Sequence, residues 1–80
     1  MKNIVVISLD RVGLVGEISK ILSRVNCNII SHSANVSYDG TTAISRFSAN
    51  VDLDSSYDDE SLSRRIKKIK NVKQVKITDL

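Results

Sequence analysis

The hydrophobic pattern of this chain changes its period at a short polar corner, and that change constrains the fold most. Lys2 to Leu9 is rich in β-branched residues and nearly apolar on both faces, which is typical of a central strand. After the corner, apolar residues recur at helical spacing: Leu14, Val15, Ile18, Ile21, Leu22 and Val25. The corner, Asp10 to Gly16, therefore predicts a strand-to-helix loop, and Asn26 is expected to end the helix in the left-handed conformation.

Two alternating runs joined by a tight turn follow the helix. In the run from Asn28 to Tyr38, the residues expected on one face are Ile30, His32, Ala34, Val36 and Tyr38. We expect His32 to be partly buried, because it shares this face with apolar residues. Asp39-Gly40 predicts a hairpin turn, since both residues tolerate the positive φ that such turns need. The returning strand, Thr42 to Leu53, places Phe47 on its apolar side.

A second helix and a last strand complete the chain. Ser56 and Asp59 stand at capping-box spacing and predict the start of the helix. Its apolar stripe is Leu62, Ile66 and Ile69. Acidic residues lead this helix and the basic run Arg64 to Lys68 closes it, as the helix dipole favours, so the run has a structural explanation. The last strand is marked by Val72, Val75 and Ile77.

The order strand, helix, strand, strand, helix, strand predicts an α+β, ferredoxin-like βαββαβ fold. It comprises one domain, residues 1–80, with a four-stranded antiparallel sheet and two helices on one face. Right-handed crossovers place the first and third strands in the middle. The second strand is then an edge without lysine or proline, so we expect a homodimer through that edge. Stacking of sheet faces leaves a similar sequence signature, and the dimer geometry stays open at this stage.

Composition excludes several classes of protein. The single cysteine, Cys27, is expected to be a partly buried structural residue, and with the single histidine it is too little for a disulfide or zinc scaffold. No apolar run approaches the roughly 20 residues of a membrane span, and the start at Met1-Lys2 lacks a signal-peptide pattern, so we expect a cytoplasmic protein without membrane contact. No catalytic constellation, phosphate-binding loop or DNA-reading motif is evident. We expect no cofactor and no metal, and the domain itself is not expected to be an enzyme.

The run from Asp10 to Val15, followed by Ile18, Leu22 and Asn28-Ile29, resembles the ACT domain pattern. ACT domains are small regulatory modules of this fold that bind amino acids or other effectors at a dimer interface. A closer resemblance is to the carboxy-terminal ACT domain of the RelA and SpoT family of GTP pyrophosphokinases and hydrolases. It rests on Asp10 to Leu14, on the hairpin from Tyr38 to Ala43, and on the tail from Ile66 to Val75. This resemblance implies (p)ppGpp synthesis in the stringent response by an upstream catalytic part, and it implies ribosome contact through that parent protein.

The resemblance also implies a ligand site. The residues it assigns are Asp10, Arg11, Val12, Gly13, Leu14, Val15, Asn28 and Ile29. Free N–H groups at the start of the first helix suit the carboxylate of an amino acid, and Asn28 would contribute hydrogen bonds from the neighbouring subunit. Both have structural alternatives: Gly13 as a residue needed only for a tight turn, and Asn28 as a helix-capping or turn residue.

Two other functions remain as alternatives. The first is a stand-alone amino-acid-binding ACT protein. The second is an RNA-binding module: Gly13-Leu14-Val15-Gly16 matches the GxxG pattern of KH domains, and RNA-recognition motifs share the strand order. Against RNA binding, the GxxG run lacks a basic residue, and Ile44 and Arg46 stand where stacking aromatic residues would be expected on the open sheet face.

Overall fold

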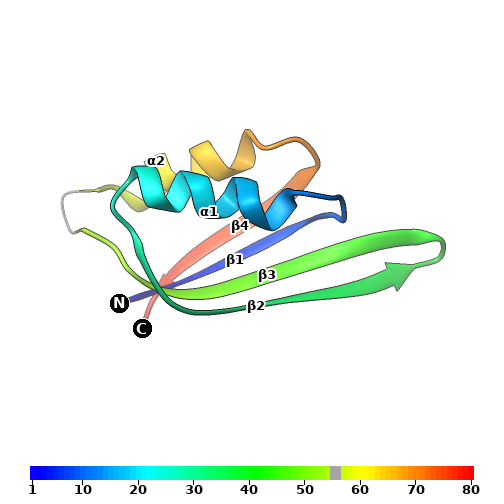
Figure 1. Cartoon of the computed structure of the whole chain (residues 1–80), viewed down its shortest axis with the longest axis horizontal. Helices are drawn as coiled ribbons and strands as arrows, with labels where there is room; N and C mark the ends of the chain where they lie inside the picture. The colour runs from blue at the N-terminus through cyan, green and yellow to red at the C-terminus, as the bar shows by residue number, and fades with distance from the viewer. Residues whose placement is uncertain (55–56) are drawn as a thin grey trace.

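Six elements follow the predicted order in the computed structural model, which describes residues 1–54 and 57–80. They are β1 (Lys2–Leu9), α1 (Leu14–Arg24), β2 (Asn28–Asp39), β3 (Thr42–Asp52), α2 (Asp59–Lys67) and β4 (Val72–Asp79). The strands form one sheet in the order β2-β3-β1-β4 with all neighbours antiparallel. Both helices lie on one face of it (Figure 1). The α+β ferredoxin-like fold is confirmed, with β1 and β3 in the middle and β2 and β4 at the edges.

The hydrophobic core lies between the helices and the two central strands. The fully buried large side chains are Ile4 and Val6 of β1, Phe47 and Val51 of β3, Ile18 and Leu22 of α1, and Leu62 and Ile66 of α2. On the sheet, alternate residues face the helices, as the period of two predicts. On the helices, the apolar stripe expected from the 3.6-residue period faces the sheet. Each such side chain stabilises the fold by about 1.5–3 kcal/mol through burial.

Strand β2 differs from the sequence prediction at its start. The ladder with β3 shifts register between Ile29 and Ser31, so Ile29 pairs with Val51, Ser31 pairs with Asn50, and Ile30 is the extra residue of a bulge. Ile30 therefore breaks the regular alternation in which it was expected to share a face with His32. From His32 onward the alternation is regular.

The prediction of a partly buried His32 was wrong. Every residue from Ile30 to Gly40 is exposed, because the described parts of both helices lie over the core strands and leave β2 uncovered. The His32 ring stacks on the buried Phe47 ring with centroids 5.9 Å apart. Tyr38 is 73% exposed and Val36 50% exposed. Both faces of β2 are therefore exposed to solvent from Ile30 onward.

The local signals at turns and helix ends are confirmed with small displacements. Asn26 has φ 55°, and the Cys27 amide donates to the Leu22 carbonyl at 3.0 Å, which closes α1. In the hairpin, Asp39 still pairs with Thr42, so the positive φ falls on Gly40, at 64°. The residue that caps α2 is Asp58, whose carboxylate accepts from the Glu60 amide at 3.4 Å. Ser56, the predicted cap, lies outside the described residues.

The two ends of the chain lie together, at the end of the sheet away from the hairpin tip (Figure 1). The Leu80 amide donates to the Met1 carbonyl at 3.1 Å. Lys2 forms ion pairs with Asp79 on β4 and with Asp59 at the start of α2, the latter at 2.9 Å. These hydrogen bonds raise the pKa of Lys2 and lower the pKa of Asp79. Among the described residues, neither helix has the length and apolarity needed to cross a membrane.

Candidate functional site

Six of the predicted site residues lie in the β1–α1 loop and the first turn of α1, and this loop is anchored to two neighbouring segments. The Asp10 amide donates to the Ala43 carbonyl of β3 at 2.9 Å, and the Leu9 amide donates to the Asn71 carbonyl before β4 at 3.0 Å. Gly13 caps α1 with φ 84°, a left-handed conformation that favours glycine. Gly16 lies inside the helix and has no such requirement. Only the first of the two glycines is therefore needed for the turn.

Arg11 fixes the shape of this loop. Its guanidinium forms an ion pair with Glu17 in the first turn of α1, and its Nε donates to the Lys70 carbonyl at 3.3 Å. The side chain thereby joins the loop to the turn between α2 and β4. Because its charge is paired with Glu17, Arg11 mainly positions the loop, and its exposed neighbours are the groups most open to a ligand.

The start of α1 offers backbone donors. In the described part of the chain no side chain caps this helix. The Leu14 amide donates to the Arg11 carbonyl at 3.4 Å, and the Glu17 amide donates to the Gly13 carbonyl at 3.0 Å. A helix leaves its first N–H groups without intrahelical partners and carries partial positive charge there. Val12 is 99% exposed beside these donors, whereas Leu14 is buried and Val15 packs against the core. Of the predicted residues, Asp10, Val12 and Gly13 face solvent, while Leu14 and Val15 hold the helix in place.

Asn28 and Ile29 lie where α1 meets β2. They line an open depression of about 460 Å³ together with Ser19, Ser23, Asn26 and Cys27. Asn28 is exposed, and Ile29 is partly buried against the core. Cys27, which precedes them, is 7% exposed, and burial raises the pKa of its thiol, as expected for a structural cysteine.

The two groups of predicted site residues do not meet within one chain. The loop lies at the start of α1 and Asn28 lies beyond its end, and 11 helical residues separate them by about 16 Å. Although β1 and β2 share a sheet, β3 lies between them. A ligand contacting both groups in one chain would have to span the length of the helix.

Two residues near the loop were not predicted from sequence. Tyr38 pairs directly with Ala43, the residue whose carbonyl accepts the Asp10 amide. The hairpin end of β2 is thereby linked to the β1–α1 loop through Ala43 of β3. Tyr38 was recognisable as part of an alternating strand, but the role of Ala43 depends on the pairing of β1 and β3, which no local signal shows.

The order of elements and strands defines the class of a small ferredoxin-like βαββαβ module. The chain matches the ACT domain family over residues 2–76 and belongs to that family. No curated protein sequence gives a significant match.

Similar solved structures share the fold. The ACT domain of a GTP pyrophosphokinase from Chlorobium tepidum superposes with a TM-score of 0.74 at 19% identity, covering 96% of this chain and 95% of that one. An ACT domain protein from Streptococcus pneumoniae has a TM-score of 0.77 at 24% identity, covering 96% and 85%. A formyltetrahydrofolate deformylase from Pseudomonas putida has a TM-score of 0.74 at 10% identity, covering 99% of this chain but 28% of that one.

Proposed function

We propose that this chain is a dimeric, cytoplasmic ACT regulatory domain that binds an amino-acid effector between two copies. The observation that carries the proposal is the separation of the predicted site residues to opposite ends of α1, combined with an unpaired edge strand of 12 residues running between those ends. Each copy alone has half of a site at each end. Pairing through β2 would complete both.

Antiparallel pairing of two β2 strands about a two-fold axis supplies the missing half. An axis at Ser33, near the middle of β2, would bring the Asn28 end of one strand beside the Tyr38 end of the other. Tyr38 pairs with Ala43, which is bonded to Asp10 at the β1–α1 loop. Asn28 of one copy would therefore come to the same end of the sheet as the loop of its neighbour.

The two possible dimer surfaces differ in chemistry, and the difference favours the edge. On the open sheet face, Val5 and Ile7 are flanked by Arg46 and Lys76 and by the amide or hydroxyl groups of Asn3, Gln74 and Thr78. Stacking two such faces would bury like charges and polar groups. The β2 edge instead presents unpaired backbone groups, and on the helix side the exposed Ala34, Val36 and Tyr38. Pairing of two β2 strands would satisfy the unpaired backbone groups. It would also bring the exposed apolar side chains of the two copies together on the helix side of the sheet.

The chemistry of this shared site suits a free amino acid. The Val15 and Gly16 amides in the first turn of α1 would bind its carboxylate, and the Asn28 amide group of the second copy would bind its polar backbone atoms. The side chain of the effector would contact Val12 of one copy and Ile29 of the other. Because binding needs both copies in one arrangement, the effector would favour that arrangement by its differential affinity, which is how an attached enzyme would be controlled.

The parent protein we propose is a GTP pyrophosphokinase of the (p)ppGpp type, with this domain as its regulatory part. Support comes from the loop, hairpin and tail motifs and from the fold shared with the Chlorobium tepidum domain. The test is the reading frame upstream of Met1: a continuous catalytic region with pyrophosphoryl transfer from ATP to GTP supports this parent. An unrelated upstream region, or none, contradicts it and leaves a stand-alone amino-acid-binding protein.

The site is tested by a two-dimensional amide NMR titration with the proteinogenic amino acids. We expect saturable shifts confined to residues 12–16 and 28–31, accompanied by a dimer in sedimentation at the same concentration. Asn28→Ala should abolish the response, while Asn35→Ala, an exposed asparagine on the same strand, should preserve it. Silence across the whole panel would overturn the effector site, and a monomer at high micromolar concentration would overturn the edge dimer.

A further inference from the structure

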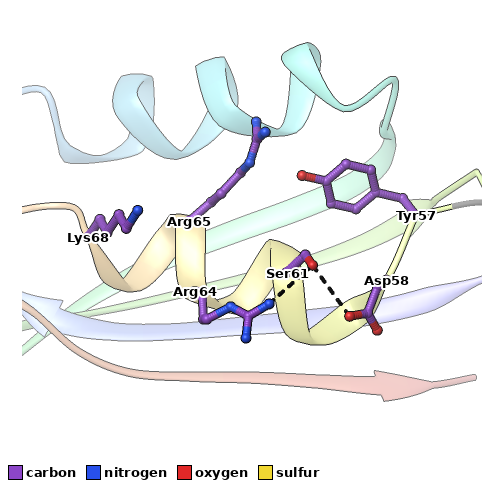
Figure 2. A pocket seen from close by; sticks show the side chains of 6 residues that line it. All are labelled: Tyr57, Asp58, Ser61, Arg64, Arg65 and Lys68. Atoms are coloured by element: carbon purple, nitrogen blue, oxygen red, sulfur yellow. Dashed lines mark hydrogen bonds between the residues drawn. The ribbon is translucent and has the colours of Figure 1, made fainter.

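A basic pocket on α2 stands apart from the proposed effector site. It has a volume of about 440 Å³ and is lined by Tyr57, Asp58, Ser61, Arg64, Arg65 and Lys68. Figure 2 shows these side chains along α2 and on the segment just before it, with Lys68 at the carboxyl end of the helix, Asp58 at its start and Tyr57 ahead of it. Between Ser61 and Thr78 the sequence has seven lysine or arginine residues and no aspartate or glutamate. The pocket thus lies in the most basic part of the chain.

The helix dipole does not account for where these guanidinium groups lie. The last carbonyls of α2 already accept hydrogen bonds from backbone amides. The Lys68 amide donates to the carbonyls of Arg64 at 3.2 Å and Arg65 at 3.3 Å, and the Ile69 amide donates to the Ile66 carbonyl at 3.0 Å. The Arg64 side chain extends toward the start of the helix, and the Arg65 side chain extends away from the helix on the side of Tyr57 (Figure 2). They are held in place by other groups.

Each arginine has its own support. Arg65 lies over the Tyr57 ring, with its guanidinium carbon 5.8 Å from the ring centroid. Arg64 donates to the Ser61 hydroxyl at 3.3 Å, and that hydroxyl donates to Asp58 at 3.3 Å (Figure 2). A guanidinium has five N–H donors, so each arginine keeps donors free after these contacts. No described carboxylate forms an ion pair with Arg64, Arg65 or Lys68.

We propose that this pocket binds a small phosphate-bearing ligand through Arg64, Arg65 and Lys68. Planar guanidinium groups match the spacing of phosphate oxygens, and a lysine adds a point charge. Asp58 is the one carboxylate among the lining residues. It accepts hydrogen bonds from the Glu60 amide and the Ser61 hydroxyl at the positive end of the helix. The carboxyl end of α2 repels anions, so binding rests on the three side chains rather than on the backbone.

Pyrophosphate is the probe for this site, added to the 80-residue chain at physiological ionic strength and compared with an equal ionic strength of sodium chloride. In amide and arginine Nε NMR spectra we expect saturable shifts at Tyr57, Ser61, Arg64, Arg65 and Lys68. The double variant Arg64→Gln/Arg65→Gln should raise the dissociation constant by about tenfold or more, because it removes two charged hydrogen-bond donors.

The matched control is Lys73→Gln/Lys76→Gln, which removes the same charge from exposed positions of β4. It should change the dissociation constant by less than about twofold, since exposed charges act weakly at this ionic strength. Equal weakening by both double variants would overturn the proposal, because the binding would then depend on net charge alone. Lack of a saturable response to pyrophosphate would also overturn it. If a single-stranded RNA bound where pyrophosphate did not, the pocket would be a nucleic-acid docking surface instead.

Discussion

The sheet has two regions that differ in what covers them. The covered region comprises β1, the part of β3 from Ser45 to Val51, and the two helices, and here the helix-facing side chains are almost completely buried. The bare region is β2 from Ile30 to Asp39. Every residue there is exposed, although its side chains alternate between the two faces of the sheet from His32 onward, as those of β3 do. The same strand period thus leads to opposite environments.

The difference shows that the fold and the proposed function rest on separate parts of the molecule. The covered region contains most of the hydrophobic core, which is buried within the chain itself. The bare region adds little apolar burial of its own, and an exposed edge strand of this length is a template for pairing. Substitutions in the two regions should therefore affect different measurements.

The largest expected effect is on the stability of the covered region. Phe47→Ala should lower the free energy of unfolding by about 3–5 kcal/mol, because a fully buried aromatic side chain leaves a cavity. The control, Tyr38→Ala in the bare region, should change it by less than about 0.5 kcal/mol. Urea unfolding at a concentration where the chain is monomeric measures both. Similar losses in the two variants would erase the distinction between the regions.

The next effect concerns pairing through the bare region. Val36→Lys places a charge on an exposed edge position and should raise the dissociation constant of the dimer by about tenfold or more, a change of about 1.4 kcal/mol. Thr78→Lys makes the same change in charge on the other edge strand, β4, and should leave the dimer intact. Sedimentation equilibrium distinguishes the two. If only Thr78→Lys dissociated the dimer, the interface would lie at β4 rather than at β2.

A smaller effect is expected at the loop where the covered region meets the proposed site. Gly13→Ala should destabilise the fold by about 1 kcal/mol, because φ is 84° there, although an added Cβ would meet no described atom within 4 Å. Gly16→Ala, inside the helix and equally open, should stabilise the fold by about 0.5–1 kcal/mol. Thermal unfolding should show shifts of opposite sign. Destabilisation by both would mean that crowding, not backbone conformation, requires glycine.

The smallest expected effect comes from the ion pairs of Lys2. The pKa of Asp79 is lowered from its ordinary value of 3.8, so its contribution to stability is present above that pH and is lost as pH falls through the lower, folded-state pKa. The pKa of Lys2 is raised above 10.5, so its contribution is present below that pH and is lost only at more alkaline values. Lys2→Met should return the pKa of Asp79 toward 3.8 in a carboxyl carbon NMR titration. An unchanged Asp79 titration would show that the ion pair does not persist in solution.

Much of the fold was predictable because its signals are local. The bounds of β1 and the end of α1 just before Asn26 follow from residue periodicity and from one asparagine in the left-handed conformation. The central placement of β1 and β3 follows from chain connectivity and handedness. The bulge at Ile30 was not predictable, because it depends on the register between β2 and β3 rather than on either strand alone.

By itself, the sequence determined the elements, their order and the two groups of candidate site residues, because short-range periodicity and turn chemistry encode them. Only the tertiary structure decided that neither described helix covers β2, which leaves His32 exposed, and that the β2–β3 ladder shifts register at Ile30. Each of these depends on which surfaces other elements cover or support. The packing of residues distant in the chain sets that coverage, and a hydrophobic pattern does not record it.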